Sequence, residues 1–206
     1  MRVGIFGGTF DPPHIGHLIL ASEAVEQLQL DRLLWVLTPD PPHKQEKIIS
    51  PSNIRLGLLQ AAIADNPRFA LSRVELDRPG PHYALDTVAL LREQFLGGEL
   101  VYLIGGDSLR DLPTWHEPQA LVRAVDGFGV MPRPDAEYDL PTLEATLPGI
   151  AKKTFFLDVP LIEISSTDIR ARLARGRSAR YFLPAPVYAQ IVAQGYYLRE
   201  PRQALD

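Results

Sequence analysis

The chain has 206 residues, of which 46% are hydrophobic and 22% charged, a composition typical of a globular protein with a sizeable core. It contains no cysteine, which excludes disulfides, thiolate metal sites and thiol nucleophiles and fits a reducing cytoplasm. The net charge of −4 argues against a nucleic-acid polymer as partner, and no apolar run approaches the roughly 18 residues of a membrane span. We expect a single domain over residues 1–206. Whether copies associate into a homo-oligomer stays open.

Short apolar runs alternate with helical patterns along most of the chain. β-branched and aromatic runs predict strands, and apolar residues at a spacing near 3.6 predict helices. The predicted strands are Val3–Phe6, Arg32–Leu37, Phe69–Val74, Leu100–Ile104, Phe128–Met131, Thr154–Leu157 and Val159–Ile164. The predicted helices are His17–Leu30, Asn53–Ala64, Thr87–Phe95, Pro118–Ala124, Thr167–Arg175 and Pro186–Gln194. This order predicts an α/β fold, a Rossmann-like doubly wound parallel sheet with helices on both faces and a helical C-terminal end.

Loops dense in glycine, proline and polar residues follow several of the predicted strands. Ligands of open α/β sheets bind where the carboxyl ends of the strands meet such loops, so we look for the site there. The proline-containing stretch Pro132–Pro148 carries no such motif, and we expect it to be a solvated surface segment.

The loop after the first predicted strand pairs glycines with histidines. Gly7 and Gly8 allow a tight turn and close approach of a ligand, and a helix start favours an anionic phosphate. His14 and His17 are three residues apart, which places both imidazoles on one face of the first turn, and Gly16 leaves backbone open between them. A lone histidine or glycine pair is usually structural. The combination favours a triphosphate site, and the chain has neither a GxxxxGK[ST] nor a GxGxxG motif.

A second cluster of polar residues lies near the C-terminal end, over Ile164–Arg170. Ser or Thr before a helix is commonly a cap, and Ser166 or Thr167 could serve as one. Capping does not account for three successive hydroxyls with an arginine four residues after Ser166. Arg170 is suited to stabilising negative charge on transferring phosphates.

Three further segments bear on a second substrate. These are Pro41–Lys44, Gly80–Thr87 and Leu103–Leu109, the last followed by Trp115. Each has a plain structural interpretation: an exposed lysine, a helix cap at Thr87 and an ordinary core indole. A tryptophan in a loop near a strand's carboxyl end is also suited to stacking on a flat aromatic ring.

The Gly7–His17 segment resembles the phosphate-binding signature of the nucleotidylyltransferase superfamily, whose HxGH element class I aminoacyl-tRNA synthetases share. A synthetase would need a far longer chain and a lysine-containing KMSKS-type loop. With Ile164–Arg170 and the three loops, the chain resembles the bacterial nicotinate mononucleotide adenylyltransferase family from Gly4 to Pro184. The resemblance implies transfer of adenylate from ATP to nicotinate mononucleotide, giving nicotinate adenine dinucleotide and pyrophosphate in NAD biosynthesis. It also implies Mg²⁺ carried mainly by ATP, without protein metal ligands.

The same resemblance implies roles for individual residues. The catalytic residues would be His14, His17 and Arg170. The ATP-binding residues would be Gly7, Gly8, Thr9, Phe10, His14, Gly16, His17, Gly105, Asp107, Ile164, Ser166, Thr167 and Arg170. The mononucleotide-binding residues would be Lys44, Tyr83, Ala84, Thr87, Trp115 and Arg133.

Three alternatives stay open. The family often has Ser-Tyr-Thr where this chain has His82-Tyr83-Ala84, so the preference for nicotinate over nicotinamide is undecided. The acceptor could instead be phosphopantetheine or, for a cytidylyltransferase, a phosphorylated polyol. A nucleotide sensor without turnover is the alternative outside the enzymes.

Overall fold

A six-stranded, all-parallel sheet organises the chain, whose computed structural model describes residues 1–40, 49–132, 139–160 and 162–198. The strands are β1 Arg2–Gly8, β2 Arg32–Leu37, β3 Phe69–Ser72, β4 Glu99–Gly105, β5 Gly127–Met131 and β6 Thr154–Phe156. Their order in the sheet is β3-β2-β1-β4-β5-β6. The chain runs outward from β1 in one direction and then returns to the other side of β1 with β4. The carboxyl ends of β1 and β4 therefore form the topological switch point, the place at which ligands bind in such sheets.

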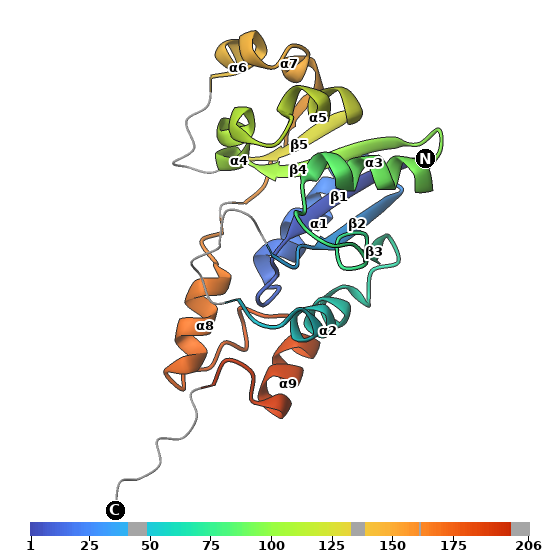
Figure 1. The fold of residues 1–206 in the computed structure, drawn as a ribbon. Helices are drawn as coiled ribbons and strands as arrows, with labels where there is room; N and C mark the ends of the chain where they lie inside the picture. The colour runs from blue at the N-terminus through green and yellow to red at the C-terminus, as the bar shows by residue number, and fades with distance from the viewer. Residues whose placement is uncertain (41–48, 133–138, 161, 199–206) are drawn as a thin grey trace, which may run out of the picture.

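Helices cover both faces of the sheet, as the sequence predicts (Figure 1). They are α1 Ile15–Gln27, α2 Ser52–Ile63, α3 Ala84–Gln94, α4 Gly106–Asp111, α5 Pro118–Ala124, α6 Leu140–Thr146, α7 Ile150–Lys153, α8 Ser166–Ala174 and α9 Ala185–Gln194, with a 3₁₀ turn at Leu112–Thr114. Strand β1 shows why its sequence is a continuous apolar run. Val3 and Ile5 pack with α3 and α5 on one face, and Phe6 packs with α1 and α2 on the other. Because both faces are buried, alternation of polar and apolar residues is lost.

The C-terminal helices extend the fold beyond the sheet. Figure 1 shows α8 and α9 together at the end of the molecule where α2 lies, and α6 and α7 at the opposite end. Val187 and Ile191 of α9 belong to the same buried cluster as Leu58 and Leu59 of α2. The predicted helical C-terminal end is therefore confirmed, and it is anchored to the sheet domain by apolar burial.

One predicted strand is not formed by the described residues, and one expected surface segment proves to be partly helical. The described residues of Val159–Ile164 form no strand, and the sheet ends at β6. Pro160 lacks the N–H that a ladder would require, which counts against an interior strand here. The described part of Pro132–Pro148 lies mostly exposed at the surface, as expected, but it forms the helix α6, and Leu143 and the following Leu147 anchor it at 6% and 0% exposed.

No helix in the described ranges is both long and apolar enough to cross a membrane.

Candidate active site

The loop from β1 to α1 is fixed by an aromatic anchor. Phe10 has a left-handed φ of 46°, and its ring, only 2% exposed, packs at 5.2 Å from Trp35 and 5.1 Å from His17. A Cβ on Gly8 would come within 2.8 Å of the same ring, which explains the glycine. The side chain of Phe10 thus holds the loop, and only its backbone is available to a nucleotide.

The two histidines of the motif stack on each other. Their ring centroids are 3.7 Å apart with an interplanar angle of 27°. His14 is the residue before α1 rather than part of its first turn, and His17 is the third residue of the helix. The backbone N–H of His14 donates to Nδ1 of His17 at 3.1 Å. In the neutral imidazole of His17 the proton is therefore on Nε2, which makes that atom a hydrogen-bond donor.

His14 is the more deeply buried of the pair. It is 6% exposed, and burial lowers its pKa from 6.5 to about 4, so the ring is neutral at pH 7. Its Nδ1 is buried and has no hydrogen-bond partner in the described part of the chain. A Cβ on Gly16 would lie 3.1 Å from this Nδ1 and 3.2 Å from Cε1. Gly16 is consequently required by the imidazole of His14, whatever ligand the backbone also admits.

The predicted opposing wall, α8, docks on the same loop. The Ser166 hydroxyl donates to the carbonyl of Pro12 at 2.9 Å, and Arg170 Nη1 donates to the carbonyl of Asp11 at 2.6 Å. The cap of α8 is Ser165, whose Oγ accepts from the N–H of Asp168 at 3.1 Å. The alternative of Ser166 or Thr167 as the cap is wrong, because the helix begins one residue earlier than predicted.

Asp11 and Arg55 support this arrangement, although neither has an individual role among the predicted site residues. Asp11 is 3% exposed; its carboxylate accepts from the Tyr197 hydroxyl at 2.8 Å and from the N–H of Ser50 at 3.2 Å. Arg55 is 1% exposed and donates to the carbonyls that follow β1 and β2. Asp11 could have been suspected from its place inside the Gly7–His17 segment.

On the other side of the site, Thr87 supports a loop from within. It is fully buried, and its Oγ1 donates to Oε1 of Glu75 at 2.8 Å. Arg78 Nη2 donates to the same Oγ1 at 3.3 Å and to the carbonyl of Tyr83 at 3.3 Å. Burial raises the pKa of Glu75, which is 3% exposed. The Thr87 side chain is thus enclosed beneath the loop Gly80–Tyr83 and cannot touch a ligand directly. It can affect a ligand only by fixing the shape of that loop.

Aromatic rings bring the Gly80–Thr87 segment and the residues after β4 together. Tyr83 stacks on His116 with centroids 3.9 Å apart and an interplanar angle of 19°. The neighbouring Trp115 is half-buried and meets Tyr102 edge-on at 6.4 Å. His116 was missed from the sequence, since an exposed histidine beside a tryptophan carries no pattern. Lys44 and Arg133 lie outside the described residues.

The remaining predicted residues lie at the carboxyl ends of the central strands. Gly105 ends β4 and precedes α4, which replaces the loop expected there, and Asp107 is in its first turn. Ala84 begins α3, whose preceding residue Tyr83 gives no side-chain cap. The first N–H groups of α3 therefore have no partner within the helix.

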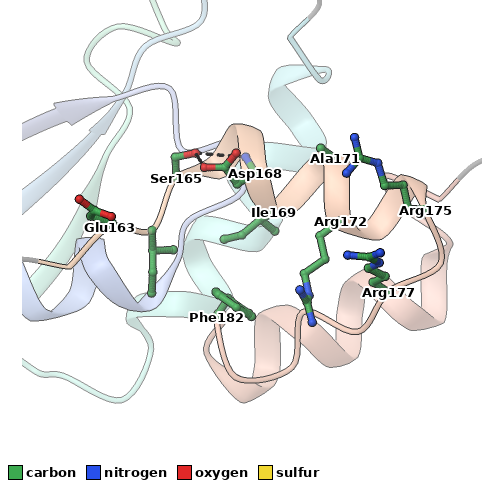
Figure 2. A pocket seen from close by; sticks show the side chains of 10 residues that line it. Glu163, Ser165, Asp168, Ile169, Ala171, Arg172, Arg175, Arg177 and Phe182 are labelled. Atoms are coloured by element: carbon green, nitrogen blue, oxygen red, sulfur yellow. Dashed lines mark hydrogen bonds between the residues drawn. The ribbon is translucent and has the colours of Figure 1, made fainter.

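A pocket of about 280 Å³ adjoins this site and shares Ile164 and Ser165 with it (Figure 2). Its lining includes Ile164, Ser165 and Asp168 together with Arg172, Arg177 and Phe182. Neither the histidine pair nor Arg170 lines it. In the described ranges, no three His, Asp, Glu or Cys residues are grouped as metal ligands.

Comparison with known proteins shows which family the chain resembles along its length. A family model described as cytidylyltransferase-like matches residues 5–172. A probable nicotinate-nucleotide adenylyltransferase of Thermomicrobium roseum is 47% identical, over 95% of this chain and 91% of its own length. One of Thermus thermophilus is 44% identical over 96% of this chain and 100% of its own length.

A solved structure has the same fold. The nicotinic acid mononucleotide adenylyltransferase of Plasmodium falciparum, complexed with NaAD, superposes with a TM-score of 0.77 at 17% identity, over 95% of this chain and 97% of that chain. The Rossmann-like architecture predicted from the sequence is thereby confirmed. With the identity to the bacterial proteins along nearly its full length, the chain belongs to the bacterial nicotinate-nucleotide adenylyltransferase family.

Proposed function

We propose that the chain joins ATP and nicotinate mononucleotide to give nicotinate adenine dinucleotide and pyrophosphate, a step of NAD biosynthesis, in the cytoplasm. The observation that carries the proposal is the stacked His14–His17 pair after β1, with Arg170 bonded to Asp11 of the same β1–α1 loop. The choice of nicotinate mononucleotide as the acceptor rests on membership of the family, because the histidine pair by itself fits any nucleotidyl transfer.

In this proposal the mononucleotide phosphate attacks the α-phosphorus of ATP in line. A new P–O bond forms as the bond to the β-phosphate oxygen breaks, and pyrophosphate leaves with the bonding electrons. The attacking oxygen is already anionic, so the protein has no nucleophile to activate, and its task is positioning and charge stabilisation.

Each protein group has a distinct part in that task. His17 donates Nε2–H to the α-phosphate, and His14 donates to the phosphates without adding charge, because burial keeps it neutral. Arg170 and the start of α1 stabilise the negative charge that builds up. The backbone of Gly7–Phe10, with Gly105, Asp107 and the Ile164–Thr167 segment, binds the rest of ATP. Mg²⁺ would be held mainly by the phosphate oxygens of ATP, since it prefers oxygen ligands, and would offset phosphate charge.

The mononucleotide lies against the residues after β4 and the start of α3. Trp115 stacks on the pyridine ring beside Tyr83. The uncapped N–H groups at the start of α3, from Ala84 onward, donate hydrogen bonds to the nicotinate carboxylate, and the helix dipole favours that anion over a neutral amide. Backbone recognition explains why Ala84 can stand where the family often has a hydroxyl. Lys44 and Arg133 meet the mononucleotide phosphate.

The test is an acceptor panel. The purified chain is incubated with MgATP and, separately, nicotinate mononucleotide, nicotinamide mononucleotide, phosphopantetheine or glycerol 3-phosphate, and pyrophosphate and the dinucleotide are quantified. We expect the fastest release with nicotinate mononucleotide. Faster turnover of phosphopantetheine or the polyol phosphate would replace the assigned acceptor. Silence with every acceptor, in a chain that still binds ATP, would favour a sensor.

A further inference from the structure

We propose that Arg55 is a positioning residue that fixes the loop after β1 relative to the loop after β2, and through them the two substrates relative to each other. The inference rests on the proposed function, because the first loop is assigned to ATP and the second leads to the segment assigned to the mononucleotide phosphate.

All three nitrogens of the Arg55 guanidinium donate hydrogen bonds. Nη1 donates to the carbonyls of Thr9 and Thr38, both at 2.9 Å. Nη2 donates to the carbonyl of Pro39 at 2.8 Å and to Ser52 Oγ at 3.1 Å, and Nε donates to the carbonyl of Ser50 at 2.8 Å. Thr9 directly follows β1, and Thr38 and Pro39 directly follow β2. One rigid, planar group therefore bridges the ends of two adjacent strands.

These bonds require a guanidinium. A lysine ammonium is a compact donor on a flexible stem and cannot address carbonyls in several directions within one plane. The side chain is 1% exposed, and burial lowers the pKa of Arg55, with the charge of Asp11 the largest opposing influence. Burying a cation is costly, and here the hydrogen bonds to the loop carbonyls and the charge of Asp11 offset that cost, which ties the burial of Arg55 to the shape of these loops.

The same contacts lead to the opposing wall. Ser50, which accepts from Arg55, donates its N–H to the Asp11 carboxylate at 3.2 Å. The Asp11 carbonyl in turn accepts from Arg170 at 2.6 Å. Arg55 is thus linked through Ser50 and Asp11 to Arg170, the residue assigned to stabilising phosphate charge.

Positioning of this kind should appear in turnover more than in affinity. In-line transfer needs the reacting atoms about 3–3.5 Å apart, and a misplacement of about 1 Å can cost roughly a hundredfold in rate. Each substrate can still bind its own loop when the two loops lose their mutual register. We therefore expect kcat to fall while the KM values for ATP and mononucleotide change little.

The chain offers a matched control in Arg92. It too clamps backbone, donating to the carbonyls of Gly98 at 2.5 Å and Ala124 at 2.8 Å and to Asp126 at 2.6 Å. Gly98 and Asp126 immediately precede β4 and β5, so this clamp lies at the opposite edge of the sheet. Arg55→Lys and Arg92→Lys make the same change at the two edges.

The experiment measures kcat, both KM values and the urea unfolding midpoint for Arg55→Lys, Arg55→Gln and Arg92→Lys. We expect kcat to fall at least tenfold in both Arg55 variants with KM within threefold. Arg92→Lys should keep wild-type kcat, with a smaller loss of stability because the Arg92 side chain is 35% exposed. Wild-type kcat in a folded Arg55→Lys, or an equal kcat loss in Arg92→Lys, would overturn the inference.

A second readout is independent of activity. Amide hydrogen exchange of the folded proteins should speed up in Arg55→Lys at Thr9–Asp11 and at Thr38 and Asp40, the amides on either side of Pro39, and in Arg92→Lys at neither set. Unchanged exchange in both loops of Arg55→Lys would overturn the inference about Arg55, whether or not the wild type is active. Failure of the wild type to release pyrophosphate would contradict only the proposed function.

Discussion

The substitution Gly16→Ala should separate activity from stability. A Cβ at this position lies 3.1–3.2 Å from the His14 ring, which must yield by a few tenths of an ångström. The ring has little room to do so, because it is 6% exposed and stacked at 3.7 Å on His17. The added methyl group therefore displaces the histidine pair.

Two effects of Gly16→Ala on stability, a gain in helix propensity and a cost of overpacking, oppose each other. Gly16 is the second residue of α1, where alanine is favoured by about 1 kcal/mol in helix propensity. Overpacking against a confined ring costs about 1–3 kcal/mol. We expect a net destabilisation of roughly 0–2 kcal/mol, but a kcat loss of about tenfold to a hundredfold, because catalysis depends on sub-ångström placement.

Gly57→Ala in α2 is the matched control. Its Cβ would lie 3.2 Å from Nε2 of Gln190, the far end of a flexible side chain that can move aside. We expect a gain of up to about 1 kcal/mol without a change in kcat. Steady-state pyrophosphate release and urea denaturation of both variants test the comparison. Wild-type kcat in a folded Gly16→Ala variant would refute the reasoning.

Four further outcomes follow from the site. His17→Ala should lower kcat about a hundredfold or more, as loss of a positioned donor does; a near-normal kcat would remove its role. Trp115→Ala should raise the mononucleotide KM and leave the Kd of ATP, measured calorimetrically, nearly unchanged. Thr87→Val removes the hydroxyl that donates to the buried Glu75 and should lower the free energy of unfolding by about 1–3 kcal/mol. Thr87→Ser keeps a hydroxyl and should recover most of that loss, as urea denaturation of both variants would show. His14 titrates at about 4 when folded against 6.5 ordinarily, so the unfolded chain binds the proton first. Stability present above pH 6.5 should therefore fall by up to ~3 kcal/mol toward pH 4, and pH-dependent denaturation of His14→Gln should lack this component.

The sheet was predictable because its signal is local. Each strand buried on both faces is a short apolar run, and the loop that follows β1 carries its own motif. The stacking of His14 on His17 follows from their spacing at a helix start. The described residues of Val159–Ile164 form no strand, and apolar character alone could not predict this, because a strand also needs the hydrogen bonds of a neighbouring strand, which Pro160 cannot complete.

The buried polar residues were harder to foresee, since their partners are remote in sequence. Thr87 resembles a helix cap until Glu75 lies beneath it, and Asp11 needs Tyr197 to be recognised as buried. Arg55 did carry a signal. It precedes Leu58 and Leu59 by three and four residues, which places it on the stripe of α2 that faces the core. A charge on such a stripe indicates a compensating polar network.

The two walls of the site are held by different forces, and this bears on how ATP binds. The histidine wall begins at β1, inside the sheet ladder, whereas α8 reaches it through the side-chain contacts of Ser166 and Arg170 with loop carbonyls. Arg170 now donates to the neutral carbonyl of Asp11, with the Asp11 carboxylate 3.7 Å away. A phosphate oxygen is a charged acceptor, and hydrogen bonds to charged acceptors are roughly twice as strong. The triphosphate can therefore draw Arg170 from Asp11, while Asp11 keeps its bonds to Ser50 and Tyr197 and the loop keeps its shape.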